Sequence, residues 1–207
     1  MMICRSARIV VAVAIAAVVS VAAACSSAPE LPYAEQIASW RAEKDRFMRS
    51  PESPVVEAQR ATFAELPYFP TNEEYRVPAA LRPGKVEDIL EMPTSTGQRR
   101  HMRRIGALEF TLKGESLKLT AFADASDTEL RRLFVPFFDR TNGTETYPGG
   151  RYLDLDRTAT GIYDLDFNRA YHPFCLFNAT YDCPVPPREN RLPVPVRAGE
   201  KLAQATQ

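Results

Sequence analysis

From Glu74 onward, the chain consists of short runs rich in β-branched and aromatic residues, separated by turn-forming pairs. The pairs that interrupt these runs are Pro83-Gly84, Lys113-Gly114, Asn142-Gly143 and Gly149-Gly150. Runs of about four to eight residues bounded in this way are typical of strands joined by tight turns, which pair antiparallel. The sequence therefore predicts a mainly β fold, either an antiparallel sandwich or a barrel.

Three local patterns refine this prediction. Apolar residues alternate with other residues in 108–112 and again in 117–119, on either side of Lys113-Gly114, as a hairpin with one buried face requires. Pro136 places its strand at an edge or a bulge, because proline cannot donate a hydrogen bond to a sheet. The proline-rich residues 184–195 predict an extended strap across the surface.

One or two helices are expected to precede the sheet and pack on it. Residues at helical spacing on one face of the first are Tyr33, Ile37, Trp40, Lys44 and Phe47. This helix should end at Ser50-Pro51, since a residue before proline avoids the helical conformation. Ser53 followed by Pro54 predicts a second helix that runs to about Phe63.

The N-terminus has the pattern of a bacterial lipoprotein signal peptide. Arg5 and Arg8 precede an apolar run, residues 9–24, that closes in three alanines directly before Cys25. A transmembrane anchor is one alternative, but about 16 apolar residues fall short of the roughly 20 needed to cross a bilayer. An ordinary secretory signal with an unrelated cysteine is another. We expect a signal peptide in residues 1–24 and lipidation of Cys25.

This interpretation divides the chain and places it in the cell. Residues 25–32 would be a lipidated tether, and residues 33–207 a single domain held on the extracytoplasmic face of a bacterial membrane, in the cell envelope. A diacylglyceryl group supplies two acyl chains, palmitate for example, which hold a protein stably where one chain does not. Without residues 1–24, the chain has 24 basic and 26 acidic residues, a balance that gives no electrostatic footprint for nucleic acid. No cofactor is predicted.

Cys175 and Cys183 are the cysteine pair left after removal of the signal peptide and lipidation of Cys25. In an oxidising compartment we expect them to form a disulfide. Two alternatives remain open. His172 and Cys175 could form the imidazole–thiolate pair of a cysteine nucleophile enzyme. His172, Cys175 and Cys183 could bind zinc, although the spacing between the thiols is unusual for that metal.

Residues 151–156 and 162–167 are predicted to form a second hairpin, with Asp154 directly opposite Asp164. This register sends the leucines and Tyr163 to the core and four aspartates to the other face, where opposed like charges destabilise a sheet. Screening by water, pairing with arginines from Arg99-Arg100 or Arg103-Arg104, or a hard cation would each relieve this repulsion. The candidate cation ligands are Asp154, Asp164 and Asp166.

Several longer motifs carry a family resemblance. They include TYPGGRYLDL from Thr146, LDFNRAYHPFC from Leu165, CPVPPREN from Cys183, and WRAEKDRFMRSPESP from Trp40. The chain resembles, over nearly its whole mature length, the bacterial family catalogued as domain of unknown function sixteen eighty-four. The family carries no established activity. His172 stands where the family pattern usually has Asn, which argues against a catalytic or ligating role for it.

The resemblance implies a concentration of polar residues on turns beside strands, which we interpret as a candidate ligand site. The residues predicted to bind a ligand are Asp139, Thr141, Tyr147, Arg151, Asn168, Tyr171 and Asn190. The alternative is that they are turn and corner residues whose side chains satisfy the backbone.

The function predicted from the sequence is non-catalytic binding of a small molecule, glycan fragment or protein partner by an envelope lipoprotein. The predicted cleft is rimmed by residues 139–151 and 168–190. A metal-assisted, hydrolase-like enzyme that uses the acidic hairpin is the second hypothesis. A purely structural envelope protein is the third.

Overall fold

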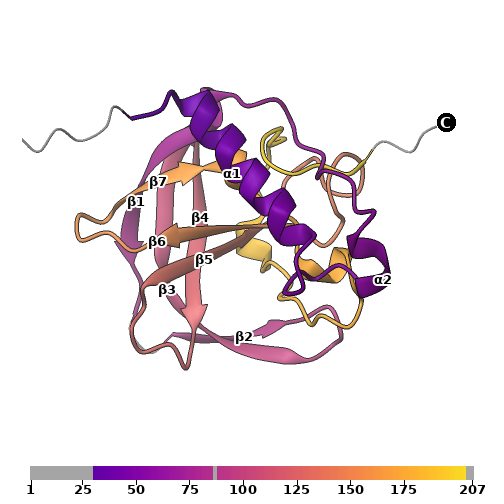
Figure 1. The fold of residues 1–207 in the computed structure, drawn as a ribbon. Coiled ribbons are helices and arrows are strands. Elements are labelled where there is room, and N and C mark those ends of the chain that lie inside the picture. The colour runs from indigo at the N-terminus through magenta and orange to yellow at the C-terminus, as the bar shows by residue number, and fades with distance from the viewer. Residues whose placement is uncertain (1–29, 86–87, 204–207) are drawn as a thin grey trace, which may run out of the picture. The chain divides into compact units, whose positions relative to one another are not determined.

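The structure is a computed structural model that describes residues 30–85 and 88–203. Residues from Leu31 onward form one compact unit. Within the described residues, seven strands form an antiparallel sheet that curves into a nearly closed barrel (Figure 1). The predicted mainly β fold is therefore confirmed. The predicted signal peptide and Cys25 lie outside the described residues.

The strands are β1 (Arg76–Pro83), β2 (Ile89–Pro93), β3 (Arg99–Leu112), β4 (Glu115–Asp124), β5 (Arg132–Phe137), β6 (Arg151–Asp156) and β7 (Ile162–Asp166). Their order in the sheet is β6-β5-β4-β3-β1-β7, and β2 pairs with β3. Apolar side chains fill the barrel, including Leu108, Leu119, Leu133, Leu153 and Leu165, each of which is at most 2% exposed. Burial of this apolar surface is the main stabilising contribution to the barrel.

The hairpin predicted around Lys113-Gly114 is confirmed as β3–β4. Leu112 lies opposite Glu115, and both turn residues have positive φ angles, 50° for Lys113 and 82° for Gly114. Two consecutive positive φ angles match the twist of antiparallel strands. Glycine adopts this conformation without steric cost.

The predicted pairing of residues 151–156 with 162–167 is wrong. β6 pairs with β5 and β7 pairs with β1, so the two strands are the two ends of the sheet order. Asp154 lies opposite Phe134, and Asp164 lies opposite Pro78. The alternation itself predicted burial correctly, apart from Asp166, because each strand buries the same face against the barrel interior whichever partner it has.

Pro136 lies in β5 between two neighbouring strands, yet the ladder between β4 and β5 has a single residue pair, Phe122 with Phe134. Beyond it, the side chain of Asn190 takes the place of a strand. Its Oδ1 accepts from the Thr120 amide at 2.7 Å, and its Nδ2 donates to the carbonyls of Thr120 at 2.8 Å and Pro136 at 2.7 Å. The predicted edge position is wrong, because β5 lies between β6 and β4, and the pairings of β5 record no bulge at Pro136; the missing donor is accommodated by the short β4–β5 ladder.

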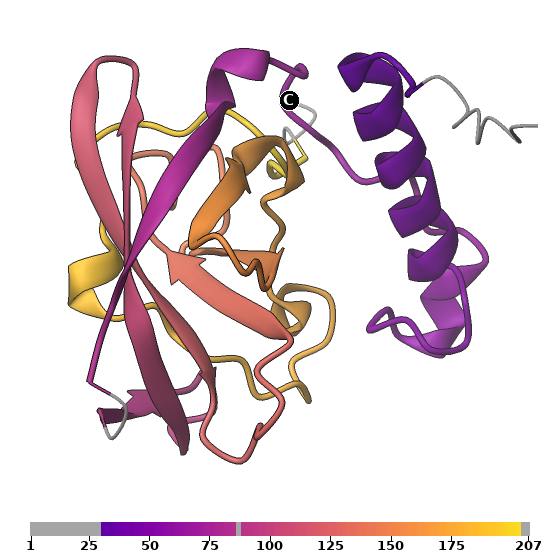
Figure 2. The same ribbon diagram turned by 90° about the vertical axis from the view of Figure 1, so that its left-hand side faces the viewer.

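Helix α1 (Tyr33–Met48) ends at the predicted position, whereas the predicted second helix is only one turn, α2 (Glu57–Arg60). Ser53 does not cap α2; its Oγ accepts from the Val55 amide, two residues away. Figure 2 shows α1 beside the barrel, with the segment after β7 between α1 and strands β3 and β4. Among the described residues, no helix is long and apolar enough to cross a membrane.

After β7 the chain is irregular. It contains the short 3₁₀ helices Phe167–Arg169, Phe174–Leu176 and Arg188–Asn190, and a fourth, Glu73–Tyr75, precedes β1. Residues 184–195 run along the barrel, where the Leu192 amide donates to the Phe138 carbonyl and the Val185 amide donates to the Pro93 carbonyl, both at 2.8 Å. These hydrogen bonds hold the segment against the residue after β5 and the last residue of β2.

Candidate functional site

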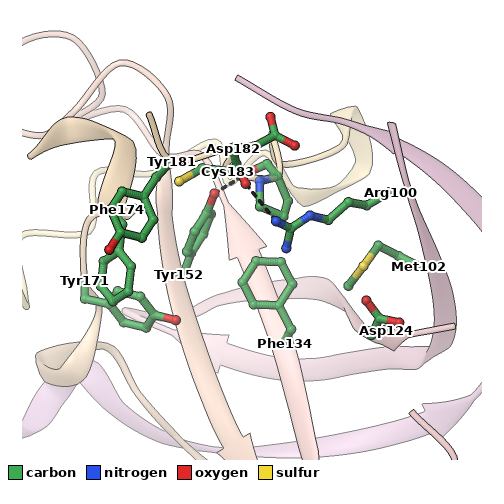
Figure 3. A pocket seen from close by; sticks show the side chains of 11 residues that line it. Arg100, Met102, Asp124, Phe134, Tyr152, Tyr171, Phe174, Tyr181, Asp182 and Cys183 are labelled. Atoms are coloured by element: carbon green, nitrogen blue, oxygen red, sulfur yellow. Dashed lines mark hydrogen bonds between the residues drawn. The ribbon is translucent and has the colours of Figure 1, made fainter. Parts of the chain in front are cut away.

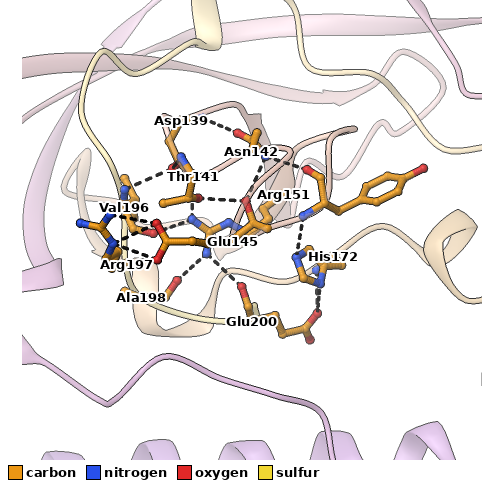
Figure 4. Close-up of polar contacts among 12 residues, drawn as sticks. Asp139, Thr141, Asn142, Glu145, Arg151, His172, Val196, Arg197, Ala198 and Glu200 are labelled. Atoms are coloured by element: carbon orange, nitrogen blue, oxygen red, sulfur yellow. Dashed lines mark hydrogen bonds and ion pairs between the residues drawn. The ribbon is translucent and has the colours of Figure 1, made fainter. Parts of the chain in front are cut away.

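Arg151, the first residue of β6, is fully buried and makes contacts inside the protein only. Its Nη2 lies 2.8 Å from Asp139 Oδ2 and donates to the Val196 carbonyl at 2.7 Å, while Nη1 donates to the carbonyls of Ala198 and Glu200 (Figure 4). The guanidinium group thus holds the C-terminal segment against the barrel. Arg151 lines none of the clefts described below, and its predicted role in ligand binding stays a prediction.

Asp139 and Thr141 belong to the same buried network. Asp139 Oδ1 accepts from the amides of Thr141 at 2.7 Å and Val196 at 3.2 Å, and the Thr141 hydroxyl pairs with that of Thr146 at 2.9 Å. The Tyr147 amide donates to Nε2 of His172 at 3.3 Å. These residues satisfy the backbone of a buried turn, which is the alternative that the sequence left open.

Gly150, which precedes Arg151, has a φ of 91° and is buried. A Cβ atom there would lie 2.7 Å from Cγ of Pro186 and 2.8 Å from the carbonyl oxygen of Phe137. Glycine is thus required for close packing between the turn and the strap.

Asn168 and Asn190 are also fully buried, and each joins separate segments. Asn168 accepts from the Asn72 amide at 3.0 Å and donates to the Tyr33 hydroxyl at 2.8 Å and to the Asn72 carbonyl at 2.9 Å. Asn190 bridges β4 and β5 as described above. Of the seven predicted ligand-binding residues, Tyr171 is the one that lines the cleft described below.

The aspartates predicted as cation ligands each have a different partner. Asp154 accepts from the Tyr171 hydroxyl at 2.8 Å, Asp164 pairs with Arg76 at 2.8 Å, and Asp166 accepts from the Tyr33 hydroxyl at 2.8 Å. All three line one opening of about 230 Å³ between β6 and β7. No group of three or more His, Cys, Asp or Glu side chains in the described residues is arranged to hold a metal ion.

Cys175 and Cys183 are free thiols in this structure, so the predicted disulfide is not formed here. They are close neighbours, because the Cys175 amide donates to Cys183 Sγ at 3.1 Å. Burial raises the pKa of the Cys183 thiol to about 11, which keeps it protonated at neutral pH. His172 is engaged by the Tyr147 amide and by Glu200, so the predicted imidazole–thiolate pair has no hydrogen bond in the structure.

A cleft of about 340 Å³ lies where residues 171–184 pass the ends of β3 to β6 (Figure 3). We call it the aromatic cleft. It is lined by Arg100, Met102, Asp124, Phe134, Tyr152, Tyr171, Phe174, Tyr181, Asp182, Cys183 and Pro184. Its volume is within the range of about 300–1,000 Å³ that is usual for sites that bind small molecules.

The aromatic rings of the cleft meet nearly at right angles. Phe134 and Tyr152 have centroids 4.8 Å apart with planes at 72°, Tyr152 and Tyr171 are 5.7 Å apart at 88°, and Phe174 and Tyr181 are 5.5 Å apart at 83°. Edge-to-face packing of this kind is favourable and fixes ring orientation. Tyr152 is buried, whereas the other four rings are half-buried and keep part of their surface open to the cleft.

The polar side of the cleft carries one cation and two anions. Arg100 Nη2 donates to the Asp182 carbonyl at 2.9 Å, and its guanidinium extends over the cleft near Phe134 and Tyr152 (Figure 3). Hydrogen bonds from Ser126 lower the pKa of Asp124, and the neighbouring hydroxyls of Thr94 and Thr96 lower that of Asp182. Both carboxylates are therefore ionised at neutral pH.

The sequence alone did not reveal this cleft, because its residues come from four strands and from residues 171–184. The signal that was available is the density of aromatic residues at 171, 174 and 181, within a segment that the sequence already marked as a rim of the predicted cleft.

Comparison with known proteins shows the family of this chain. A family model described as "Protein of unknown function (DUF1684)" matches residues 61–201. The chain belongs to the DUF1684 family. All residues of the aromatic cleft fall inside the matched range, whereas α1 lies outside it.

A solved structure is similar to this chain over most of its length. The solution NMR structure of an uncharacterized protein from Haloarcula marismortui is 39% identical in sequence, with a TM-score of 0.65. The match covers 81% of this chain and 93% of that chain. The search of curated proteins gives no match.

Proposed function

We propose that this chain is a lipid-anchored protein of the cell envelope whose DUF1684 domain binds a small molecule in the aromatic cleft and does not transform it. The observation that supports binding is the cleft itself, in which open aromatic surfaces lie beside the Arg100 guanidinium and the Asp124 carboxylate. An apolar pocket with a few convergent polar groups is the usual form of a site for a small molecule.

The protonation states of the cleft residues support binding rather than acid–base catalysis. A general acid or base works best when its pKa is near the working pH. Here the pKa values of Asp124 and Asp182 are lowered, that of Cys183 is raised to about 11, and burial raises those of the Tyr152 and Tyr171 phenols. These shifts all move the groups away from neutrality.

The anchoring part of the proposal rests on the sequence. Residues 9–24 and Cys25 have the pattern of a lipoprotein signal, and residues 25–32 would link the lipid to α1. The domain would then be held at the extracytoplasmic face of a bacterial membrane, close to its ligand.

Metabolic labelling with a radioactive or alkyne-tagged palmitate tests the anchor. We expect the full chain to incorporate label, the Cys25→Ser variant to lose it, and the Cys4→Ser variant to keep it. Label that persists in Cys25→Ser would contradict lipidation at this residue.

Ligand-observed NMR on the full chain, purified in detergent, tests the binding site. We expect at least one compound in a mixed panel of ring compounds to bind the wild-type chain. Its binding signal should be lost with the Phe174→Ala variant. Phe63→Ala is the matched control, because Phe63 is a half-buried ring that packs against Phe177 outside the cleft. A panel without any binder, or a binder indifferent to Phe174→Ala, would contradict the proposal.

A further inference from the structure

We propose that the aromatic cleft takes an uncharged sugar ring, such as one residue of an envelope glycan. This inference rests on the proposed function, because it names the ligand class of the same cleft. It draws on two properties of the cleft, the shape of its aromatic surface and the balance of its charges.

The aromatic rings form a box rather than a slot. Adjacent rings stand at 72° to 88° to one another, so the cleft presents both ring faces and ring edges. A flat aromatic ligand is held best between parallel faces, as in offset stacking. A pyranose ring has an apolar face of C–H groups and a thick, polar periphery, and this shape is complementary to a box with one apolar and one polar side.

The polar groups of the cleft can form hydrogen bonds with the hydroxyl groups of a sugar. Arg100 has N–H donors beyond the one bound to the Asp182 carbonyl, and no described residue donates to Oδ2 of Asp124. A hydroxyl can accept from a guanidinium and donate to a carboxylate at the same time. Hydrogen bonds of this kind, with one charged partner, are stronger than those between neutral groups.

The ionised carboxylate of Asp124 disfavours an anionic ligand. A phosphate or carboxylate placed beside its free oxygen would be repelled, whereas the Asp182 carboxylate is bound by the Thr96 amide and hydroxyl and turns away from the rings (Figure 3). Nucleotides and acidic sugars are therefore disfavoured. An uncharged polyhydroxy ring satisfies the donor and the acceptors without adding charge.

Saturation-transfer NMR on the full chain in detergent tests the ligand class. The probes are the methyl glycosides and disaccharides of glucose, galactose, mannose and N-acetylglucosamine, with methyl glucuronide as an anionic probe and indole as a flat apolar probe. We expect at least one uncharged sugar to bind and the glucuronide to bind about tenfold more weakly or not at all.

Two substitutions connect this binding to the cleft. Phe134→Leu should weaken sugar binding about tenfold through loss of ring contact, with Phe63→Leu unchanged. Asp124→Asn should weaken binding of the uncharged sugar several-fold. It should also reduce the difference in affinity between the uncharged sugar and the glucuronide. The matched control is Asp156→Asn, because Asp156 is an exposed strand residue outside the cleft. Asp124 is exposed at the end of β4, so its variant tests the inference even if Phe134→Leu does not fold.

The outcomes separate this inference from the proposed function. If indole binds in a Phe134-dependent manner and no sugar does, the sugar class is overturned while the cleft remains a ligand site. If neither probe class binds, both proposals fail. Sugar binding that is insensitive to both Phe134→Leu and Asp124→Asn would place the sugar elsewhere and also overturn the inference.

Discussion

At the scale of single residues, Arg151 is a buried charged side chain whose contacts hold the fold together. Its guanidinium joins Asp139 on the turn after β5 to three carbonyls of residues 196–200. We predict that Arg151→Met lowers the free energy of unfolding by about 3–5 kcal/mol, because removal of one partner leaves the other charge buried and unpaired. Urea-induced unfolding of the full chain in detergent measures this change.

The matched control for Arg151 is Arg76, which pairs with Asp164 on the surface. Their side chains are 40% and 54% exposed. Arg76→Met should change the free energy of unfolding by no more than about 1 kcal/mol, since exposed ion pairs contribute little. Equal losses in the two variants would show that Arg151 has no special structural role.

We predict that the free energy of unfolding depends on pH because of His172. Burial, together with the positive charges of Arg151 and Lys44, lowers its pKa to about 3, and its Nε2 already accepts a hydrogen bond from the Tyr147 amide. Between about pH 6.5 and 3, the unfolded chain therefore binds a proton that the folded chain does not. The free energy of unfolding should fall on acidification through this range, by up to about 1.4 kcal/mol per pH unit from this residue.

Unfolding measured between pH 7 and pH 5 checks this prediction, since most carboxylates titrate lower. His172→Asn should reduce the slope, because the Asn oxygen can accept from the same amide but does not titrate. His101→Asn should leave the slope unchanged, as the His101 side chain is 66% exposed. Identical slopes for the wild type and His172→Asn would refute the assignment.

Residue type alone could not assign the polar residues. Asp139, Arg151, Asn168 and Asn190 are predicted ligand residues because the family resemblance implies polar residues gathered on turns beside strands, and the sequence also allows a structural role. Their burial favours the structural role, and burial depends on contacts such as Asn190 with β4 and β5 that join residues 70 and 54 positions apart.

At the scale of elements, α1 is fixed to the barrel by the Tyr33 hydroxyl. It donates to Asp166 and accepts from Asn168, both at 2.8 Å. We predict that Tyr33→Phe destabilises the docking of α1 by about 1 kcal/mol, the usual net contribution of a hydrogen bond. Amide hydrogen exchange should increase in residues 33–48 and stay unchanged in β3.

The control for this experiment lies on the same helix. Arg46 is exposed in the last turn of α1, so Arg46→Ala should leave exchange of the helix nearly unchanged. If Tyr33→Phe does not raise exchange in α1, the helix is held mainly by its other contacts, such as the 2.8 Å ion pair between Lys44 and Glu200.

The two hairpin predictions differed in outcome for a physical reason. β3–β4 has a turn whose positive φ angles match the strand twist, so local sequence specifies its pairing. β6 and β7 are separated by a loop that does not force pairing, and each finds a better partner elsewhere, β5 and β1. Alternation specifies which face of a strand is buried, but not which strand lies beside it.

At the scale of the whole molecule, the barrel class and the strap followed from composition and turn signals, whereas the aromatic cleft did not. The cleft forms only when the ends of β3 to β6 and residues 171–184 come together, which is a property of the folded sheet. Its residues are far apart in the sequence, so local patterns carry no information on their convergence.

The compartment of the whole molecule should determine the state of Cys175 and Cys183. The two are adjacent free thiols in the structure, and Cys183 lines the aromatic cleft. We predict that the chain exported from the cytoplasm contains a disulfide between them, and that its mass is lower by two hydrogen atoms. Mass spectrometry of the intact protein, before and after reduction, measures this difference.

The bridge should stabilise the loop of residues 175–183 and, with it, the cleft. In the chain-entropy model, a loop of this length contributes about 2.5 kcal/mol, so Cys175→Ser should unfold at lower urea than the exported wild type. Chain retained in the cytoplasm, where thiols stay reduced, should show no such difference from Cys175→Ser. Two alkylatable thiols in the exported protein would instead mean that hydrogen bonding and packing alone hold this wall of the cleft.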